Sequence, residues 1–142
     1  MLLEGNDMSK LLPWLKVKLT PFMNIETLDI EDIPEEPGVY VMLSDHTEYE
    51  YPWGKSQVYY IGESKNLRTR LRIHKRYCKQ AISKPPREYF YARYEYAAHH
   101  GCNVGWVMSK TGKDTKTIEN DLLVDFAKYY GAKPVANGQS GW

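Results

Sequence analysis

Five side chains whose chemistry suits hydrolysis of a phosphodiester occur in order along the chain: Tyr40, Tyr60, Arg70, His74 and Glu119. Hydrolysis needs an activated water, cationic support for the charge that develops on phosphorus, and stabilisation of the departing oxyanion. Arginine matches the geometry of a phosphate, a carboxylate can hold hydrated magnesium, and a cation makes the phenolate of a tyrosine accessible. These residue types alone leave a nuclease as one function among several.

The two tyrosines are expected on paired β-strands. After a Pro-Gly turn signal, residues 39–43 alternate with a period of two, which places Tyr40 opposite a face of aliphatic side chains. A second run, 58–61, ends at a glycine, so the two runs predict a hairpin. The connection between them, 44–57, is long for a hairpin, and loops of this size are often functional.

Arg70 and His74 are expected on one amphipathic helix. The helix is predicted over residues 64–79, with Ser64 as its N-cap. Both polar side chains border the apolar stripe that must dock on the sheet, so they can reach over a strand surface.

Glu119 is expected early in a later helix, beside its buried stripe. Residues 87–100 fit either a strand or a helix, and Gly101 favours a helix with a glycine C-cap. Residues 104–108 then predict a third strand, and 114–130 have helical spacing. The element order is β-β-α-α-β-α, which predicts an α+β fold with a three-stranded antiparallel sheet flanked by helices.

The length of 142 residues predicts one compact unit. We expect residues 1–36, which contain several prolines, to form an extension that packs on a core of residues 37–142. No apolar run approaches the ~20 residues that span a bilayer, and the first ten residues lack the order of a signal peptide. Two cysteines do not suggest a disulfide scaffold, so the expected location is the cytoplasm, without membrane contact.

Charge is divided unevenly along the chain. Residues 1–54 contain eleven Asp/Glu and three Lys, a net of −8, whereas residues 65–93 contain ten Lys/Arg and one Glu, a net of +9. Such a basic stretch is typical of phosphate-backbone binding, although a charge run alone is more often a solvated helix face. The candidate DNA-binding residues of this helix are Lys65, Arg68, Arg72, Lys75 and Arg76.

Short motifs around the tyrosines resemble a known family. Gly38-Val39-Tyr40 and Tyr60-Ile61-Gly62 resemble the two half-motifs that name the GIY-YIG nucleases. Arg70, ten residues after Tyr60, His74 on the next helical turn, Glu119 in a later helix and Asn137 after a proline are also similar to that family. The resemblance spans about a hundred residues and is greatest to homing and restriction-like members. It implies a small GIY-YIG-like domain.

The resemblance also implies a role for each residue. Tyr40 would be the general base or water positioner, with Tyr60 as its partner at the scissile phosphate. Arg70 would stabilise the charge on phosphorus, and His74 would contact the phosphate or relay a proton.

Glu119 would hold one Mg²⁺ or Mn²⁺ per site, and Asn137 would brace the site. The implied activity is metal-dependent cleavage of DNA that leaves 5'-phosphate and 3'-hydroxyl ends. The departures from the family include the nineteen residues between Tyr40 and Tyr60, and Glu63 where some members have lysine.

Two other functions stay open at this point. The basic, tyrosine-rich stretch 65–94 could serve a non-catalytic nucleic-acid-binding module that tracks a backbone and stacks bases. A zinc site that uses Cys78 with His74 and Cys102 with His99 can also be drawn, although neither pair has the tight CxxC spacing of common structural sites. A homodimer or a partner protein that selects the target is a further expectation.

Overall fold

The computed structural model describes residues 11–83, 92–109 and 114–138, and it has an α+β fold. Its main sheet is antiparallel, in the order β1-β6-β2-β5. The strands are β1 (Met23–Asn24), β2 (Gly38–Leu43), β5 (Val58–Ser64) and β6 (Asn103–Met108). The predicted fold class is confirmed: the three expected strands pair as β6-β2-β5, and β1, which the sequence did not predict, adds a short fourth strand.

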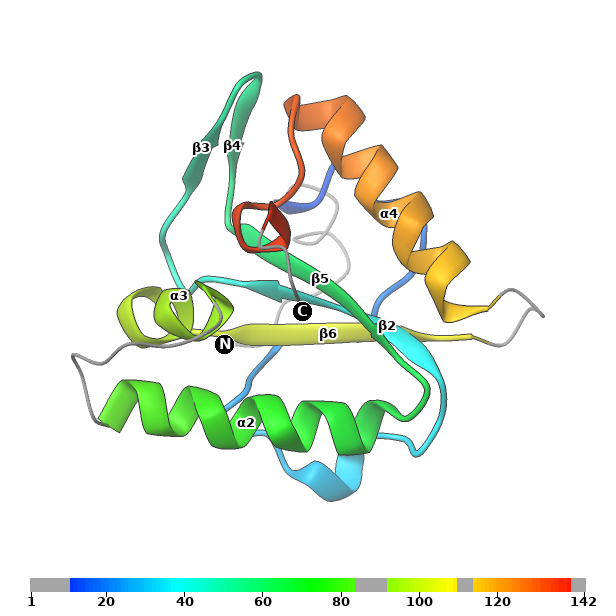
Figure 1. Ribbon diagram of the computed structural model, residues 1–142, viewed down its shortest axis with the longest axis vertical. Helices are drawn as coiled ribbons and strands as arrows, with labels where there is room; N and C mark the ends of the chain where they lie inside the picture. Colours follow the sequence, from blue (N-terminus) through cyan, green and yellow to red (C-terminus); the bar gives the residue numbers. More distant parts are fainter. Residues whose placement is uncertain (1–10, 84–91, 110–113, 139–142) are drawn as a thin grey trace.

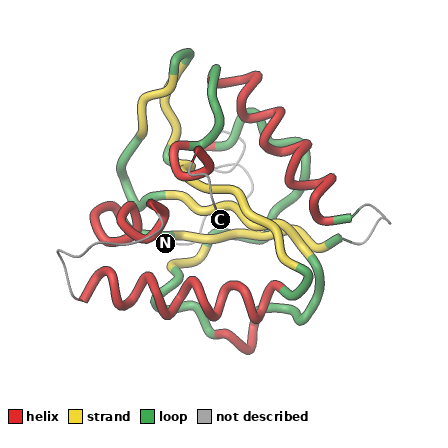
Figure 2. Tube along the Cα trace, viewed as in Figure 1, coloured by secondary structure: helices red, strands yellow, loops and turns green. Residues whose placement is uncertain are grey.

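Three α-helices of the described residues complete the predicted element order. They are α2 (Leu67–Ser83), α3 (Ala92–His100) and α4 (Thr115–Tyr130), with 3-10 turns at η1 (Ile30–Asp32) and η2 (Val135–Gly138). Helices α2 and α4 lie on opposite faces of the sheet, and α3 lies beside α2 (Figures 1 and 2). The first residues of the predicted 87–100 helix lie outside the described residues.

Successive side chains of β2 belong to two different hydrophobic cores, one on each face of the sheet. Tyr40 and Met42 belong to the core on the α2 side, whereas Val39, Val41 and Leu43 belong to the core on the α4 side. This arrangement follows from the period of two in a strand, which sends successive side chains to opposite faces. The predicted placement of Tyr40 opposite the aliphatic face is therefore confirmed.

The long connection 44–57 forms a second, two-stranded sheet. Strands β3 (Tyr49–Tyr51) and β4 (Gly54–Ser56) pair antiparallel. Tyr51 is buried, with its ring 5.1 Å from that of Phe126 and 5.6 Å from that of Tyr130. Aromatic packing on α4 thus supports a hairpin that is too short to be stable alone.

The helix ends follow capping rules, with one correction. Asp114 is the N-cap of α4, and Gly101 and Gly131 end α3 and α4 in the left-handed conformation, at φ of 84° and 85°. The prediction that Ser64 is the N-cap of α2 was wrong, because Ser64 is the last residue of β5. Asn66 caps α2 instead, and its side-chain oxygen accepts a hydrogen bond from a backbone N–H of the first turn.

The described part of the N-terminal segment packs on both cores. Leu12, Trp14 and Phe22 are buried on the α4 side, and Ile25 and Leu28 on the α2 side. The division at residue 36 stays a prediction. Among the described helices, none is long and apolar enough to cross a membrane.

Candidate active site

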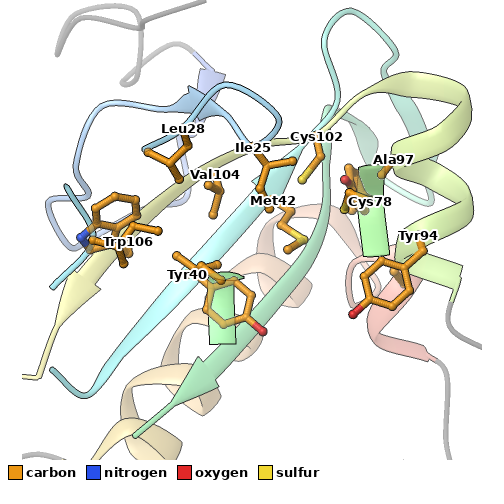
Figure 3. Close-up of a cluster of buried hydrophobic side chains, with 14 of the residues drawn as sticks. Ile25, Leu28, Tyr40, Met42, Cys78, Tyr94, Ala97, Cys102, Val104 and Trp106 are labelled. Carbon is orange, nitrogen blue, oxygen red and sulfur yellow. The ribbon is translucent and has the colours of Figure 1, made fainter. Parts of the chain in front are cut away.

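A chain of three buried side chains forms the centre of the candidate site. The Tyr40 hydroxyl is 2.7 Å from His74 Nε2, and the Tyr94 hydroxyl is 2.9 Å from His74 Nδ1. Relative exposure is 0% for Tyr40, 1% for His74 and 5% for Tyr94. Figure 3 shows the hydroxyls of Tyr40 and Tyr94 on the sides of the rings that face each other. The two hydrogen bonds join β2, α2 and α3. If these buried polar groups were unpaired, they would destabilise the fold.

Gly62 makes room for the ring of Tyr40. The two residues are partners across β2 and β5. A Cβ at position 62 would lie 2.5 Å from the Tyr40 hydroxyl and 2.9 Å from the ring of Tyr60. Because contacts this short cannot be tolerated, the glycine of the second half-motif is required by close packing of the two tyrosines.

Tyr60 lies beside this chain and is partly exposed. Its ring centroid is 6.1 Å from that of Tyr40. The guanidinium of Arg93, on α3, lies 4.9 Å from the Tyr60 ring centroid and 5.0 Å from the Tyr94 ring centroid. Cation–π contacts of this kind hold the guanidinium at the tyrosines.

Burial sets the protonation states of Tyr40 and His74. It raises the pKa of Tyr40 well above 10; nearby Tyr60 raises it further, whereas Arg70 and Arg93 lower it. Burial, followed by the charges of Arg93 and Arg70, lowers the pKa of His74 well below its ordinary value. At neutral pH the imidazole is therefore uncharged, and the Tyr40 phenol carries its proton.

The lowered pKa of His74 predicts how stability depends on pH. Below about pH 6.5, His74 takes up a proton in the unfolded chain but stays neutral in the folded protein. The free energy of unfolding therefore falls as the pH drops. We expect His74 to account for about 1 kcal/mol of the loss between pH 7.5 and 5.5. Urea unfolding at both pH values should show a smaller loss for His74→Gln than for the wild type. An equal loss in both proteins would contradict the assignment.

Arg70 is exposed on α2 and close enough to favour the ionised form of Tyr40. Within the described part of the chain, neither the guanidinium of Arg70 nor the hydroxyl of Tyr60 forms a hydrogen bond. Both groups are therefore available to a substrate, in contrast to the paired groups of the buried chain.

Some of the candidate DNA-binding cations contact other parts of the protein, whereas others are exposed. Arg68 donates to the Ile33 carbonyl at 2.8 Å and pairs with Glu35 at 3.2 Å, and Lys75 donates to the Leu28 carbonyl at 2.6 Å. The remaining candidate DNA-binding residues are exposed: Lys65, which precedes α2, and Arg72 and Arg76 on the helix. DNA contact stays a prediction for all five, and Arg68 and Lys75 would have to exchange protein contacts for it.

Glu119 lies in a second part of the site, on the α4 side of the sheet. It is half-buried; burial raises its pKa, and the nearby carboxylate of Glu63 raises it further. Glu63 itself accepts a hydrogen bond from the Thr115 hydroxyl of α4. Among the described residues, Glu119 forms no hydrogen bond or ion pair. Two neighbouring carboxylates of this kind favour a bound cation.

Strand β5 connects the two parts. Tyr60 packs with the α2-side core and Ile61 with the α4-side core, and the structure brings Tyr40, Tyr60, Arg70 and His74 together on the α2 side. Among the described residues, no hydrogen bond or ion pair joins Glu119 to these four. Because β5 is an edge strand, the side chains on its two faces lie at the same edge of the sheet.

Asn137 braces this edge strand. Its side-chain oxygen accepts from the Ile61 N–H at 2.8 Å, and its side-chain nitrogen donates to the Ile61 carbonyl at 2.7 Å. The amide thus pairs with β5 as a neighbouring strand would, next to Tyr60.

Sequence reasoning missed Arg93 and Tyr94 as members of the site. Both belong to the segment whose alternation and helical spacing were ambiguous, and no motif distinguishes them. Their neighbourhood depends on how α3 packs beside α2, which spacing alone does not specify. Among the described residues, no group of three or more His, Cys, Asp or Glu could hold a metal ion, and Cys78 and Cys102 are free and buried.

The chain is similar to part of a known protein. No family model matches the chain. The chain is 29% identical over 94 residues to UvrABC system protein C of Acaryochloris marina (strain MBIC 11017). The alignment covers 66% of this chain but 12% of that protein, so the chain spans a small part of its relative's length.

Proposed function

We propose that this protein is a metal-dependent DNA endonuclease of the GIY-YIG type. The observation that most supports the proposal is the buried Tyr40–His74 hydrogen bond beside a partly exposed Tyr60, with Arg70 close to both Tyr40 and His74. The similarity to UvrABC system protein C agrees with a nuclease that acts on DNA.

In the proposed reaction, Arg70 binds the scissile phosphate and Tyr60 contacts the phosphate or the attacking water. Tyr40 passes its own proton to His74 Nε2, 2.7 Å away, and accepts a proton from that water. Arg70 and Arg93 favour the ionised form of Tyr40 that this exchange requires. The water oxygen bonds to phosphorus, the bond to the 3'-oxygen breaks, and that oxygen takes a proton from solvent. Since Tyr40 has no exposed surface, at least one aromatic neighbour has to move before water reaches it.

The acidic pair fits Mg²⁺ or Mn²⁺. Magnesium prefers oxygen ligands and is commonly held by one or two carboxylates together with water and substrate phosphate, so a larger protein cluster is not required. Glu119 would be the principal ligand, and Glu63, whose like charge raises the pKa of Glu119, lies next to it. When bound, the metal would stabilise the charge of the leaving oxygen.

The experiment that tests this function compares plasmid, single-stranded and branched DNA. We expect cleavage of at least one form in Mg²⁺ or Mn²⁺, and none after chelation. A folded protein that binds DNA but cuts none of the three forms would favour the non-catalytic binding module. A preference for branched DNA would also narrow the substrate, and size measurement with DNA bound would test the expected homodimer.

A further inference from the structure

A second guanidinium lies at the candidate site, on a different helix from Arg70. Arg93 belongs to α3 and is partly exposed, and its guanidinium carbon lies 4.9 Å from the ring centroid of Tyr60 and 5.0 Å from that of Tyr94. Contacts with two aromatic rings hold the end of a side chain that is otherwise flexible. A cation is therefore held beside Tyr60 from α3, whereas Arg70 comes from α2.

The charge of Arg93 acts on the same groups as the charge of Arg70. For His74, burial is the largest cause of the lowered pKa, and Arg93 and then Arg70 lower it further. For Tyr40, burial and Tyr60 raise the pKa, and Arg70 and Arg93 both act in the opposite direction. Two cations from separate helices thus act on the Tyr40–His74 pair.

Two guanidiniums at one site favour a bound anion. Like charges repel each other, and an anion that contacts both removes this repulsion. A phosphate is such an anion, and it carries more negative charge on its non-bridging oxygens in the transition state of hydrolysis. The planar set of N–H groups in a guanidinium matches these oxygens, also when the guanidinium lies on an aromatic ring.

Tyr60 places Arg93 within reach of the scissile phosphate. The Tyr60 hydroxyl forms no hydrogen bond among the described residues, and the proposed reaction brings it to this phosphate or to the attacking water. Because the guanidinium of Arg93 lies over the ring that carries this hydroxyl, a phosphate at the hydroxyl is also close to Arg93.

We propose that Arg93 is a second phosphate-binding residue, which contacts the non-bridging oxygens of the scissile phosphate together with Arg70. Arg93 is then a catalytic residue that no sequence motif marks. The role in cleavage rests on the proposed function, whereas a phosphate contact can be measured without cleavage. The two can therefore fail separately.

The salt dependence of DNA binding measures the number of phosphate contacts in the absence of metal and of cleavage. The logarithm of the affinity falls with the logarithm of the salt concentration by about 0.9 per phosphate contact on duplex DNA and about 0.7 on single strands. We expect Arg93→Gln to reduce this slope by the value of about one contact, and Arg93→Lys, which keeps the charge, to retain the wild-type slope. The control is Lys16→Gln, which removes an exposed cation outside the candidate site and should leave the slope unchanged.

Single-turnover cleavage with enzyme in excess measures the contribution to catalysis. We expect the rate to fall about a hundredfold in Arg93→Gln and about tenfold in Arg93→Lys, because an ammonium lacks the planar fork of donors. Urea unfolding identifies the variants that fold. A folded Arg93→Gln with the wild-type salt slope would overturn the proposal even if its rate is reduced, because Arg93 would then act only through its charge near Tyr40 and His74. If Arg93→Gln does not fold, a wild-type rate in Arg93→Lys would overturn it instead.

The same measurements distinguish the two proposals. If the wild type binds DNA but cuts none of the forms tested, the proposed function fails, and the salt slopes still decide whether Arg93 contacts a phosphate. A wild type that binds no DNA would contradict both.

Discussion

Replacement of Glu119 by glutamine should lower the single-turnover rate of DNA cleavage about a thousandfold or more. The amide keeps the shape of the side chain but loses the charge proposed to hold the metal, whose stabilisation of the leaving oxygen amounts to several kcal/mol. DNA affinity in the absence of metal should stay unchanged, because the metal contact acts mainly in the transition state.

The same substitution should leave the protein at least as stable as the wild type. A carboxyl group whose pKa is raised in the folded state opposes folding at pH values above that pKa, and Glu63 contributes part of this cost. Loss of activity together with equal or higher resistance to urea would identify Glu119 as functional. The control is Glu36→Gln, an exposed glutamate elsewhere, which should behave as wild type. Unfolding or loss of DNA binding in Glu119→Gln would instead indicate a structural residue.

Removal of a single hydroxyl in Tyr40→Phe should lower the cleavage rate about a hundred- to ten-thousandfold. This range is typical for loss of a general base or acid. The ring of Tyr40 remains over Gly62, so packing is kept, and only the hydrogen bond to His74 is lost. The expected cost to the free energy of unfolding is about 1 kcal/mol.

Tyr51→Phe, which also removes a buried tyrosine hydroxyl, provides the comparison for the effect of Tyr40→Phe on stability and on the cleavage rate. It removes a buried tyrosine hydroxyl that donates to the Val58 carbonyl at 2.9 Å and accepts from the Val135 N–H at 3.1 Å, so its cost in stability should be at least that of Tyr40→Phe. Stopped reactions on the same DNA, with enzyme in excess, give the rates. If both variants lose activity to the same extent, the effect of Tyr40→Phe comes from stability, and Tyr40 is not the base.

Strong periodicity made most of the fold predictable. The alternation in β2 gave its two faces correctly, and Asp114 and Gly131 marked the ends of α4. Strand β1 was not predictable, because two residues carry no periodic signal and its pairing with β6 is a long-range contact. The hairpin β3–β4 was missed for a related reason: its support comes from Tyr51 packing on a helix far along the chain.

The candidate site was predictable where local motifs determine it. Tyr40, Tyr60, Arg70 and His74 meet because β2 and β5 pair with each other, with only the β3–β4 hairpin between them, and α2 follows β5 directly. Arg93 and Tyr94 could not be foreseen, since they come from a helix of ambiguous pattern that packs beside α2. The neighbourhood of Glu63 and Glu119 likewise depends on how α4 docks on β5.

The most direct test of the nuclease proposal is cleavage of end-labelled DNA in water enriched in heavy oxygen, with and without Mg²⁺, followed by mass spectrometry of both product ends. The proposed mechanism predicts products only in the presence of the metal, with the heavy oxygen on the 5'-phosphate and an unlabelled 3'-hydroxyl. Intact DNA in the presence of metal and folded protein, equal cleavage after chelation, or heavy oxygen on the 3' side would contradict it.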